Sequence, residues 1–339
     1  MTASRDQENR TTYLIDQMYV EKLVPLYGAA QKEPIVFIHG DAQTGTNWLN
    51  TPNGRLGWAS WFLEKGYTVY IVDQPQRGRS AYMPGDGSLT AFSVEQTEFQ
   101  FTDPENFDIW PQAKLHTQWP GTGRKGDPVF DAFYASQVQS QKDTAITQNS
   151  TQAAGAALLD LIGPSIVITH SQAGPIGFLI ADARPSLVKA LISLEPQGPP
   201  FENRVFTNST DIIRPWGLTN IPITYSPPVS DPAMDLHRET RPPARPDLTE
   251  CVLQAEPGAR QLVNLAKVRT LVLTTEASYH APYDYCTVQY LKQAGVVKLD
   301  YLDLPLFGVH GNGHLMFLEK NNIEIVTLIE KWIIKGELG

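Results

Sequence analysis

The sequence predicts an α/β fold in which a mostly parallel central sheet is flanked by helices. Short, continuous apolar runs alternate along the chain with longer segments that are apolar on one side only. Such runs are typical of strands buried on both faces, and the alternation is typical of a parallel sheet covered by helices. The stretch 165–174 (SIVITHSQAG) is a clear example: its residues predict a buried strand, then a tight turn at Ser171, then the start of a helix.

Composition narrows the class of protein. The chain has 339 residues, 42% of them hydrophobic, which is enough for one large domain with a sizeable core. The formal net charge is −9 and no cluster of Lys or Arg stands out, so nucleic acid and anionic membranes are not expected partners. The first ten residues lack an apolar signal segment, and no apolar run is long enough to cross a bilayer.

The low cysteine content is relevant to the cellular compartment. Only Cys251 and Cys286 occur, so neither a disulfide framework nor a cysteine metal site is expected. Together with the polar N-terminus, this predicts a cytoplasmic protein.

The individual elements follow in chain order. Residues 12–23 alternate in polarity, which predicts one or two antiparallel strands at the sheet edge. Continuous apolar runs predict buried strands at 34–38, 68–72, 165–168, 187–194, 268–275 and 297–304. Helical spacing of apolar residues predicts helices at 57–65, 143–162, from 172 onward, 283–294 and 321–335.

Two long segments, 81–140 and 199–260, interrupt this rhythm. The first is rich in aromatic residues with Pro and Gly between them, and the second is rich in Pro; neither shows a long regular pattern. Long loop-rich insertions with many aromatics are more often functional than disordered. We therefore expect a single domain, 1–339, in which both segments form a cap or lid, with Trp110 and Trp119 contacting substrate.

The three residue types needed for nucleophilic catalysis occur along the chain in the order serine, acid, histidine. Ser171 lies at the turn after a buried strand, an acid follows a later strand, and a histidine lies in the glycine-rich loop 308–314. A serine hydroxyl needs a base to take its proton, and histidine serves because it titrates near neutrality. A carboxylate must orient the imidazole, and backbone N–H groups, here expected from Asp41 and Gln172, must bind the developing oxyanion.

The residues alone leave the acid open between Glu195 after one strand and Glu276 or, further on, Asp284 after the next, and the base between His314 and His310. The chain resembles the α/β-hydrolase superfamily over nearly its whole length, and most closely an atypical esterase subgroup. The matching stretches are FIHG (37–40), TG (44–45), TPNGRLGW (51–58), DQPQRGRS (73–80), HSQ (170–172), EP (195–196) and GVHGNGH (308–314). In that subgroup the acid is a Glu after the sixth strand, so the resemblance implies the triad Ser171, Glu195 and His314.

The expected function is therefore a serine hydrolase that cleaves a carboxylic ester or lactone, without metal or cofactor. The alternative is a protein of the same fold that does not hydrolyse: an acyltransferase, a C–C bond enzyme or a ligand-binding module. The aromatic segment favours a medium-sized apolar or aromatic acyl group. A small-molecule ester or lactone is the expected partner, and a homodimer is left open.

Overall fold

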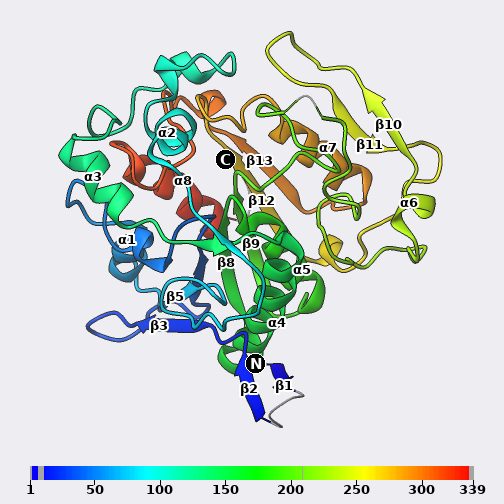
Figure 1. Ribbon diagram of the computed structural model, residues 1–339, viewed down its shortest axis with the longest axis horizontal. Helices are drawn as coiled ribbons and strands as arrows, with labels where there is room; N and C mark the ends of the chain where they lie inside the picture. Colours follow the sequence, from blue (N-terminus) through cyan, green and yellow to red (C-terminus); the bar gives the residue numbers. More distant parts are fainter. Residues whose placement is uncertain (1, 7–10, 208, 336–339) are drawn as a thin grey trace.

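A computed structural model describes residues 2–6, 11–207 and 209–335 (Figure 1). Its centre is a seven-stranded sheet in the order β13-β12-β9-β8-β4-β5-β3. All neighbours pair in parallel except β3, which runs antiparallel to β5 at the edge. The strands are β3 (Tyr19–Leu23), β4 (Ile35–Ile38), β5 (Val69–Asp73), β8 (Ser165–His170), β9 (Val188–Leu194), β12 (Arg269–Thr274) and β13 (Leu299–Asp303).

Helices cover both faces of this sheet, and the alternation of side chains along each strand explains the two layers. In β4, Ile35 and Phe37 join one buried cluster, whereas Val36 and Ile38 join the other. The first cluster packs against helices α1 (Trp58–Glu64) and α8 (Asn322–Lys335), and the second packs against α4 (Thr144–Ile162), α5 (Ala173–Ala183) and α7 (Asp284–Gln293). Both faces of the strands are apolar because both are covered.

These elements confirm the predicted fold class and every predicted strand and helix, with ends shifted by one or two residues. The predicted edge strands are β2 (Thr11–Ile15) and β3, of which only β3 joins the central sheet. β2 instead pairs with β1 (Thr2–Asp6). Within the described part of the chain, no helix is long and apolar enough to cross a membrane.

The two insertions contain more regular structure than the sequence predicted, all of it short. Segment 81–140 holds β6 (Leu89–Thr90), α2 (Val94–Thr97), a π-helical turn (Glu98–Thr102), α3 (Pro128–Ala135) and β7 (Ser140–Gln141). Segment 199–260 holds α6 (Pro232–Asp235) and the hairpin β10 (Arg238–Arg241) and β11 (Cys251–Gln254). They lie on opposite sides of the view in Figure 1, cyan to green at the left and yellow at the right.

Although two cysteines were not expected to form a disulfide framework, they do pair with each other. Cys251 in β11 and Cys286 in α7 form a disulfide between residues 35 apart in sequence, and both are buried. The bond ties the second insertion to a helix of the main fold. Local sequence patterns do not indicate this pairing, because it depends on where the Pro-rich segment returns to the domain.

Candidate active site

Ser171 lies where the connectivity of the sheet reverses. From β4 the chain continues to β5 on one side, and β8 then pairs with β4 on the other side. In open parallel sheets, ligands bind at the carboxyl ends of the strands at this switch point. Ser171 directly follows β8 and has a positive φ of 55°, a conformation that is rare for residues other than glycine and costs backbone strain.

The strained turn is held by backbone hydrogen bonds and close packing. The Ser171 N–H donates to the Leu194 carbonyl over 3.0 Å, and its own carbonyl accepts from Gly174 and Gln197. A side chain at position 174 would collide with Pro196, because its Cβ would lie 2.4 Å from a Pro196 carbon. The turn therefore needs Gly174, which brings helix α5 against the strand ends.

Thr169, which stands where similar turns have a glycine, is accommodated by a glycine on the facing helix. A Cβ added to Gly177 would lie 2.8 Å from the Thr169 methyl carbon. The methyl group of Thr169 thus fills the space that Gly177 leaves. Gly177 in α5 therefore makes room for Thr169 at the position where the usual turn has a glycine.

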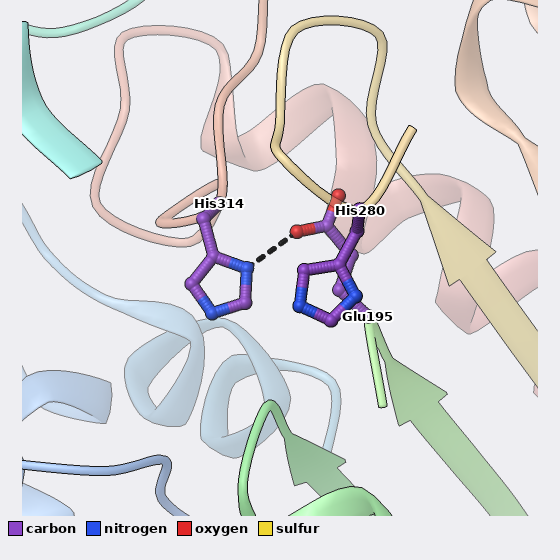
Figure 2. Close-up of side chains that lie close together, drawn as sticks. All are labelled: Glu195, His280 and His314. Carbon is purple, nitrogen blue, oxygen red and sulfur yellow. Dashed lines mark hydrogen bonds and ion pairs between the residues drawn. The ribbon is translucent and has the colours of Figure 1, made fainter. Parts of the chain in front are cut away.

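Glu195 and His314 point toward each other across the strand ends (Figure 2). The Nδ1 of His314 donates a hydrogen bond of 2.6 Å to Oε2 of Glu195, and both side chains are buried. Glu195 directly follows β9, and His314 comes from the loop between β13 and α8. With its proton on Nδ1, the ring leaves Nε2 free to accept a proton.

The Glu195 carboxylate is surrounded by donors. Its Oε1 accepts from the Thr275 backbone N–H at 2.8 Å and from the Thr275 hydroxyl at 2.6 Å, and its Oε2 accepts from the Ser278 hydroxyl at 2.7 Å. Burial raises the pKa of the Glu195 carboxyl, while the proximity of the His280 ring and these hydrogen bonds act in the opposite direction. The three donors favour the ionised carboxylate, although burial has the larger effect on its pKa.

His314 lies between two other histidine rings. The His170 ring centre is 4.4 Å away and the His280 ring centre is 4.8 Å away, the latter nearly parallel. Burial lowers the pKa of His280 to about 4. Burial, followed by the proximity of His280, also holds the pKa of His314 well below its ordinary value, so its resting ring is neutral and able to act as a base.

Ser171 and His314 line the same cavity, but no hydrogen bond joins their side chains within the described residues. The hydroxyl of Tyr279 instead lies 3.3 Å from Nε2 of His314, and the Ser171 side chain also interacts with that hydroxyl. The sequence analysis missed Tyr279 because nothing in the local sequence pattern points to it. Burial strongly raises the pKa of Tyr279, which keeps its hydroxyl protonated.

The loop after β4 faces Ser171. Among the hydrogen bonds of the described residues, none uses the backbone N–H of Asp41 or Gln172. Buried Arg77 braces both sides: it donates to the Gly40 carbonyl at 3.1 Å, to the Gln172 side-chain oxygen at 3.0 Å, and lies 3.6 Å from the Asp41 carboxylate. Arg77 therefore holds the loop after β4 against the start of α5, and within the described part of the chain the two N–H groups beside Ser171 have no partner.

The cavity above Ser171 measures about 330 Å³. Both insertions contribute to its wall; the residues that matter below are Phe92, Gln100 and Phe101 from the first, and Asn203, Arg204 and Phe206 from the second. A volume at the low end of the usual range of ligand pockets favours a compact ligand.

Trp110 and Trp119, predicted to contact substrate, are not in the cavity wall. Both are buried in the core, with only 3% of their surface exposed. Trp110 donates to the Ala277 carbonyl at 3.0 Å and packs edge-on against Phe206 and Tyr279, which do line the cavity. The prediction placed the aromatic segment correctly beside the cavity but assigned contact to residues that lie behind its wall.

The alternative acid and base pair with each other away from the cavity. His310 donates from Nδ1 to Glu276 at 2.9 Å, and Glu276 also accepts from the Gly311 backbone N–H at 2.8 Å. The His310 side chain is 60% exposed. Neither residue lines the cavity that contains Ser171.

Among the described residues, Glu195, His280 and His314 also lie close enough together to be considered as metal ligands, with one ligand atom of each within 4.8 Å of the others. Figure 2 shows that Glu195 and His314 face one another rather than a common point in space. Their facing atoms already share a hydrogen bond, and Nδ1 of His280 is bonded to Asp284 at 2.8 Å. The facing atoms of Glu195 and His314 and the Nδ1 of His280 are therefore already engaged in hydrogen bonds.

Comparison with known proteins identifies the chain's relatives. No protein-family model matches it. It is 53% identical over 318 residues to a protein named probable secreted lipase phiG of a fungal species (strain ATCC 74256), covering 94% of this chain and 86% of that one. Among solved structures, a novel bacterial esterase superposes with a TM-score of 0.60 at 24% identity, covering 97% of this chain and 89% of that one.

These relatives also correct one expectation. The prediction of a cytoplasmic protein is wrong, because the 53% identical relative is named as secreted. A polar first segment was a poor guide, and the disulfide that the sequence analysis also missed agrees with the correction, since disulfides persist in oxidising surroundings. Taken with the sheet order and the serine at its switch point, the chain belongs to the α/β-hydrolase superfamily and is a carboxylic ester hydrolase.

Proposed function

We propose that this protein is a serine esterase that works through an acyl-enzyme, with Ser171 as nucleophile, His314 as base and Glu195 as the orienting acid. The observation that carries the proposal is the hydrogen bond of 2.6 Å between Glu195 and His314, beside a cavity that also contains Ser171. The acid follows β9, one strand before the position used in the commoner arrangement of this fold. Glu195 is fully buried and oriented by three donors, as a triad carboxylate must be.

In the proposed reaction, Oγ of Ser171 attacks the ester carbonyl carbon while Nε2 of His314 takes the hydroxyl proton. The negative charge that forms on the carbonyl oxygen is stabilised by the N–H groups of Asp41 and Gln172 and by the N-terminus of α5. His314 then returns the proton to the departing alcohol, and water repeats the sequence to release the acid. Contact between serine and histidine is often loose without substrate, so the present geometry is compatible with this role.

The cavity suggests which esters are taken. Phe92, Phe101 and Phe206 offer aromatic surface, whereas Gln100, Asn203 and Arg204 offer hydrogen-bond donors. With a volume of about 330 Å³, this lining favours a compact acyl group that combines apolar and carbonyl or hydroxyl functions over a long plain hydrocarbon chain. The two insertions, 81–140 and 199–260, would act as the cap that selects the substrate. As in the relative, the working environment would be extracellular.

Hydrolysis of a short p-nitrophenyl ester tests the proposal. Ser171→Ala should lower kcat by about 10⁶-fold, as in triads of this type, while the unfolding temperature stays within a few degrees of the parent. Ser136→Ala, which changes an exposed serine outside the cavity, is the matched control and should leave kcat unchanged. Residual activity above one tenth in Ser171→Ala would disprove the assignment. Adding an alcohol and measuring transfer against hydrolysis distinguishes an acyltransferase from an esterase.

A further inference from the structure

His116, in the first insertion, is held between two carboxylates. Its Nδ1 lies 2.8 Å from Oε2 of Glu105, and its Nε2 lies 2.8 Å from Oε1 of Glu319. The side chains of His116 and Glu319 are completely buried, and that of Glu105 is 31% exposed. A neutral imidazole has one N–H and therefore donates only one hydrogen bond. Satisfying both carboxylates requires the doubly protonated, positively charged ring.

Among the described residues, the other charged side chains near this ring make their contacts elsewhere, and Lys320 donates from Nζ to the Thr117 carbonyl at 2.9 Å. Arg124, which binds Asp103, is close enough for Glu105 to act on it, and Arg55 donates to the backbone carbonyl of Glu319 at 2.8 Å. Neither arginine contacts His116. The two carboxylates thus dominate its surroundings and raise the pKa of His116 to about 9, against the opposing effect of burial.

Glu319 connects this ion pair to the loop that carries His314. Its carboxylate accepts from the Gly313 backbone N–H at 2.9 Å and from the Asn312 side-chain amide at 2.7 Å. Packing is tight here, since a Cβ on Gly313 would lie 3.0 Å from the His116 ring. Gly313 is the residue before His314, so Glu319 fixes the backbone from which the base projects.

The segment that follows His116 is docked on the same loop. The N–H groups of Thr117 and Gln118 donate to the Gly311 carbonyl, and the Lys320 N–H donates to the Gln118 carbonyl. These backbone bonds do not depend on charge. The ion pairs of His116 are therefore added to contacts that the backbone already makes. Loss of the positive charge on His116 is not expected to detach the segment that follows it from the loop.

We infer that His116 is a positioning residue, whose positive charge, shared between Glu105 and Glu319, fixes the loop of His314 and whose deprotonation limits catalysis at alkaline pH. The inference rests on the proposed function, because it assigns His314 as the base. Without the charge, one carboxylate loses its hydrogen bond and repels its neighbour in a buried space. Glu319 would then shift together with Gly313.

The direction of the pH dependence follows from the raised pKa. A group whose pKa is higher in the folded than in the unfolded protein stabilises the fold fully below its ordinary value, here about 6.5. This contribution disappears as the pH rises through about 9. We therefore expect the unfolding temperature to fall between about pH 6.5 and 9, where the unfolded chain has lost the proton that the folded ring still holds. We expect kcat to follow the charge of the folded ring and to fall between pH 8 and about 10, with little change in KM, because the residues that line the cavity are not altered.

The test compares pH profiles of kcat and of thermal unfolding in the parent, Glu105→Gln and His310→Gln. Glu105→Gln removes one carboxylate from His116 without changing the His314 loop, and should move the alkaline limb down by about 1 pH unit. His310→Gln is the matched control: it breaks a His–Glu pair on the same loop, but an exposed one, and should leave the limb in place. A third variant, His116→Gln, should lower kcat at neutral pH and remove the fall between pH 8 and 10.

Identical alkaline limbs in the parent and in Glu105→Gln would overturn the inference, as would an equal shift in His310→Gln. If the parent hydrolyses no ester, the proposed function fails. The unfolding profiles still decide the charge state of His116 in that case, because they do not require activity. A purely structural role would lower stability in His116→Gln at every pH by the same amount, and this outcome too would refute the inference.

Discussion

Reducing or removing the disulfide between Cys251 and Cys286 should destabilise this protein by an amount that its loop length sets. The bond joins residues 35 apart, and closing a loop of that length lowers the entropy of the unfolded chain by about 13 cal/mol/K. At 25 °C this corresponds to about 4 kcal/mol of stability. A chain of 339 residues unfolds with an entropy of about 0.7 kcal/mol/K, so the unfolding temperature should fall by about 5 °C.

The assay is thermal unfolding of the oxidised parent, of the parent refolded with reductant, and of the double variant Cys251→Ala/Cys286→Ala. Reduced parent and double variant should both unfold about 5 °C below the oxidised parent, and only the parent should respond to reductant. The variant adds a small cost for the two buried sulfur atoms it deletes. If the parent unfolds at one temperature with and without reductant, the bond does not form in solution and the reasoning fails.

Three further predictions concern the site. Glu195→Gln should lower kcat by roughly 10⁴-fold, because an amide presents the wrong partner to the imidazole, whereas Glu276→Gln should cost less than about tenfold; the opposite ranking would move the acid to the end of β12. Trp110→Ala should lower the free energy of unfolding in urea by about 3–5 kcal/mol, because the ring is buried. Phe206 is 42% exposed and lies in the cavity wall, so Phe206→Ala should mainly change the preference between bulky and short esters. If both variants change this preference equally, the assignment of the two rings is contradicted. Because the pKa of His314 is held well below its ordinary value, the base stays neutral as the pH falls, so activity should persist below about pH 6.5; an acid limb at or above that value in kcat/KM would contradict the assigned environment.

Much of the fold could be predicted because its signals are local. Runs such as Ile35–Ile38 are apolar at every position, which only a strand buried on both faces requires. The switch from strand to helix at Ser171 could be predicted for the same reason. Helix α3 could not, although Asp127 caps it and Pro128 begins it, because the surrounding Gly and Pro residues indicated only loop.

The site also contains residues that the local sequence indicates and residues that only the fold brings together. Ser171 could be predicted from its local sequence, because it directly follows a recognisable buried strand. The choice of Glu195 over Glu276 and of His314 over His310 came from the family resemblance and not from the local pattern. What orients them could not be predicted: Thr275 and Ser278 reach Glu195 from a segment 80 residues later. Trp110 was chosen for its residue type, yet type alone does not tell whether an aromatic ring lies in a wall or behind it.

Labelling with a fluorophosphonate probe, followed by peptide mass spectrometry, shows whether Ser171 is an activated nucleophile. The probe forms a stable adduct only with a serine whose hydroxyl is activated by a base. We predict one adduct, on Ser171, which forms much more slowly in Glu195→Gln and is absent in Ser171→Ala. An adduct on a different serine, or an active enzyme that the probe leaves unlabelled, would contradict this prediction.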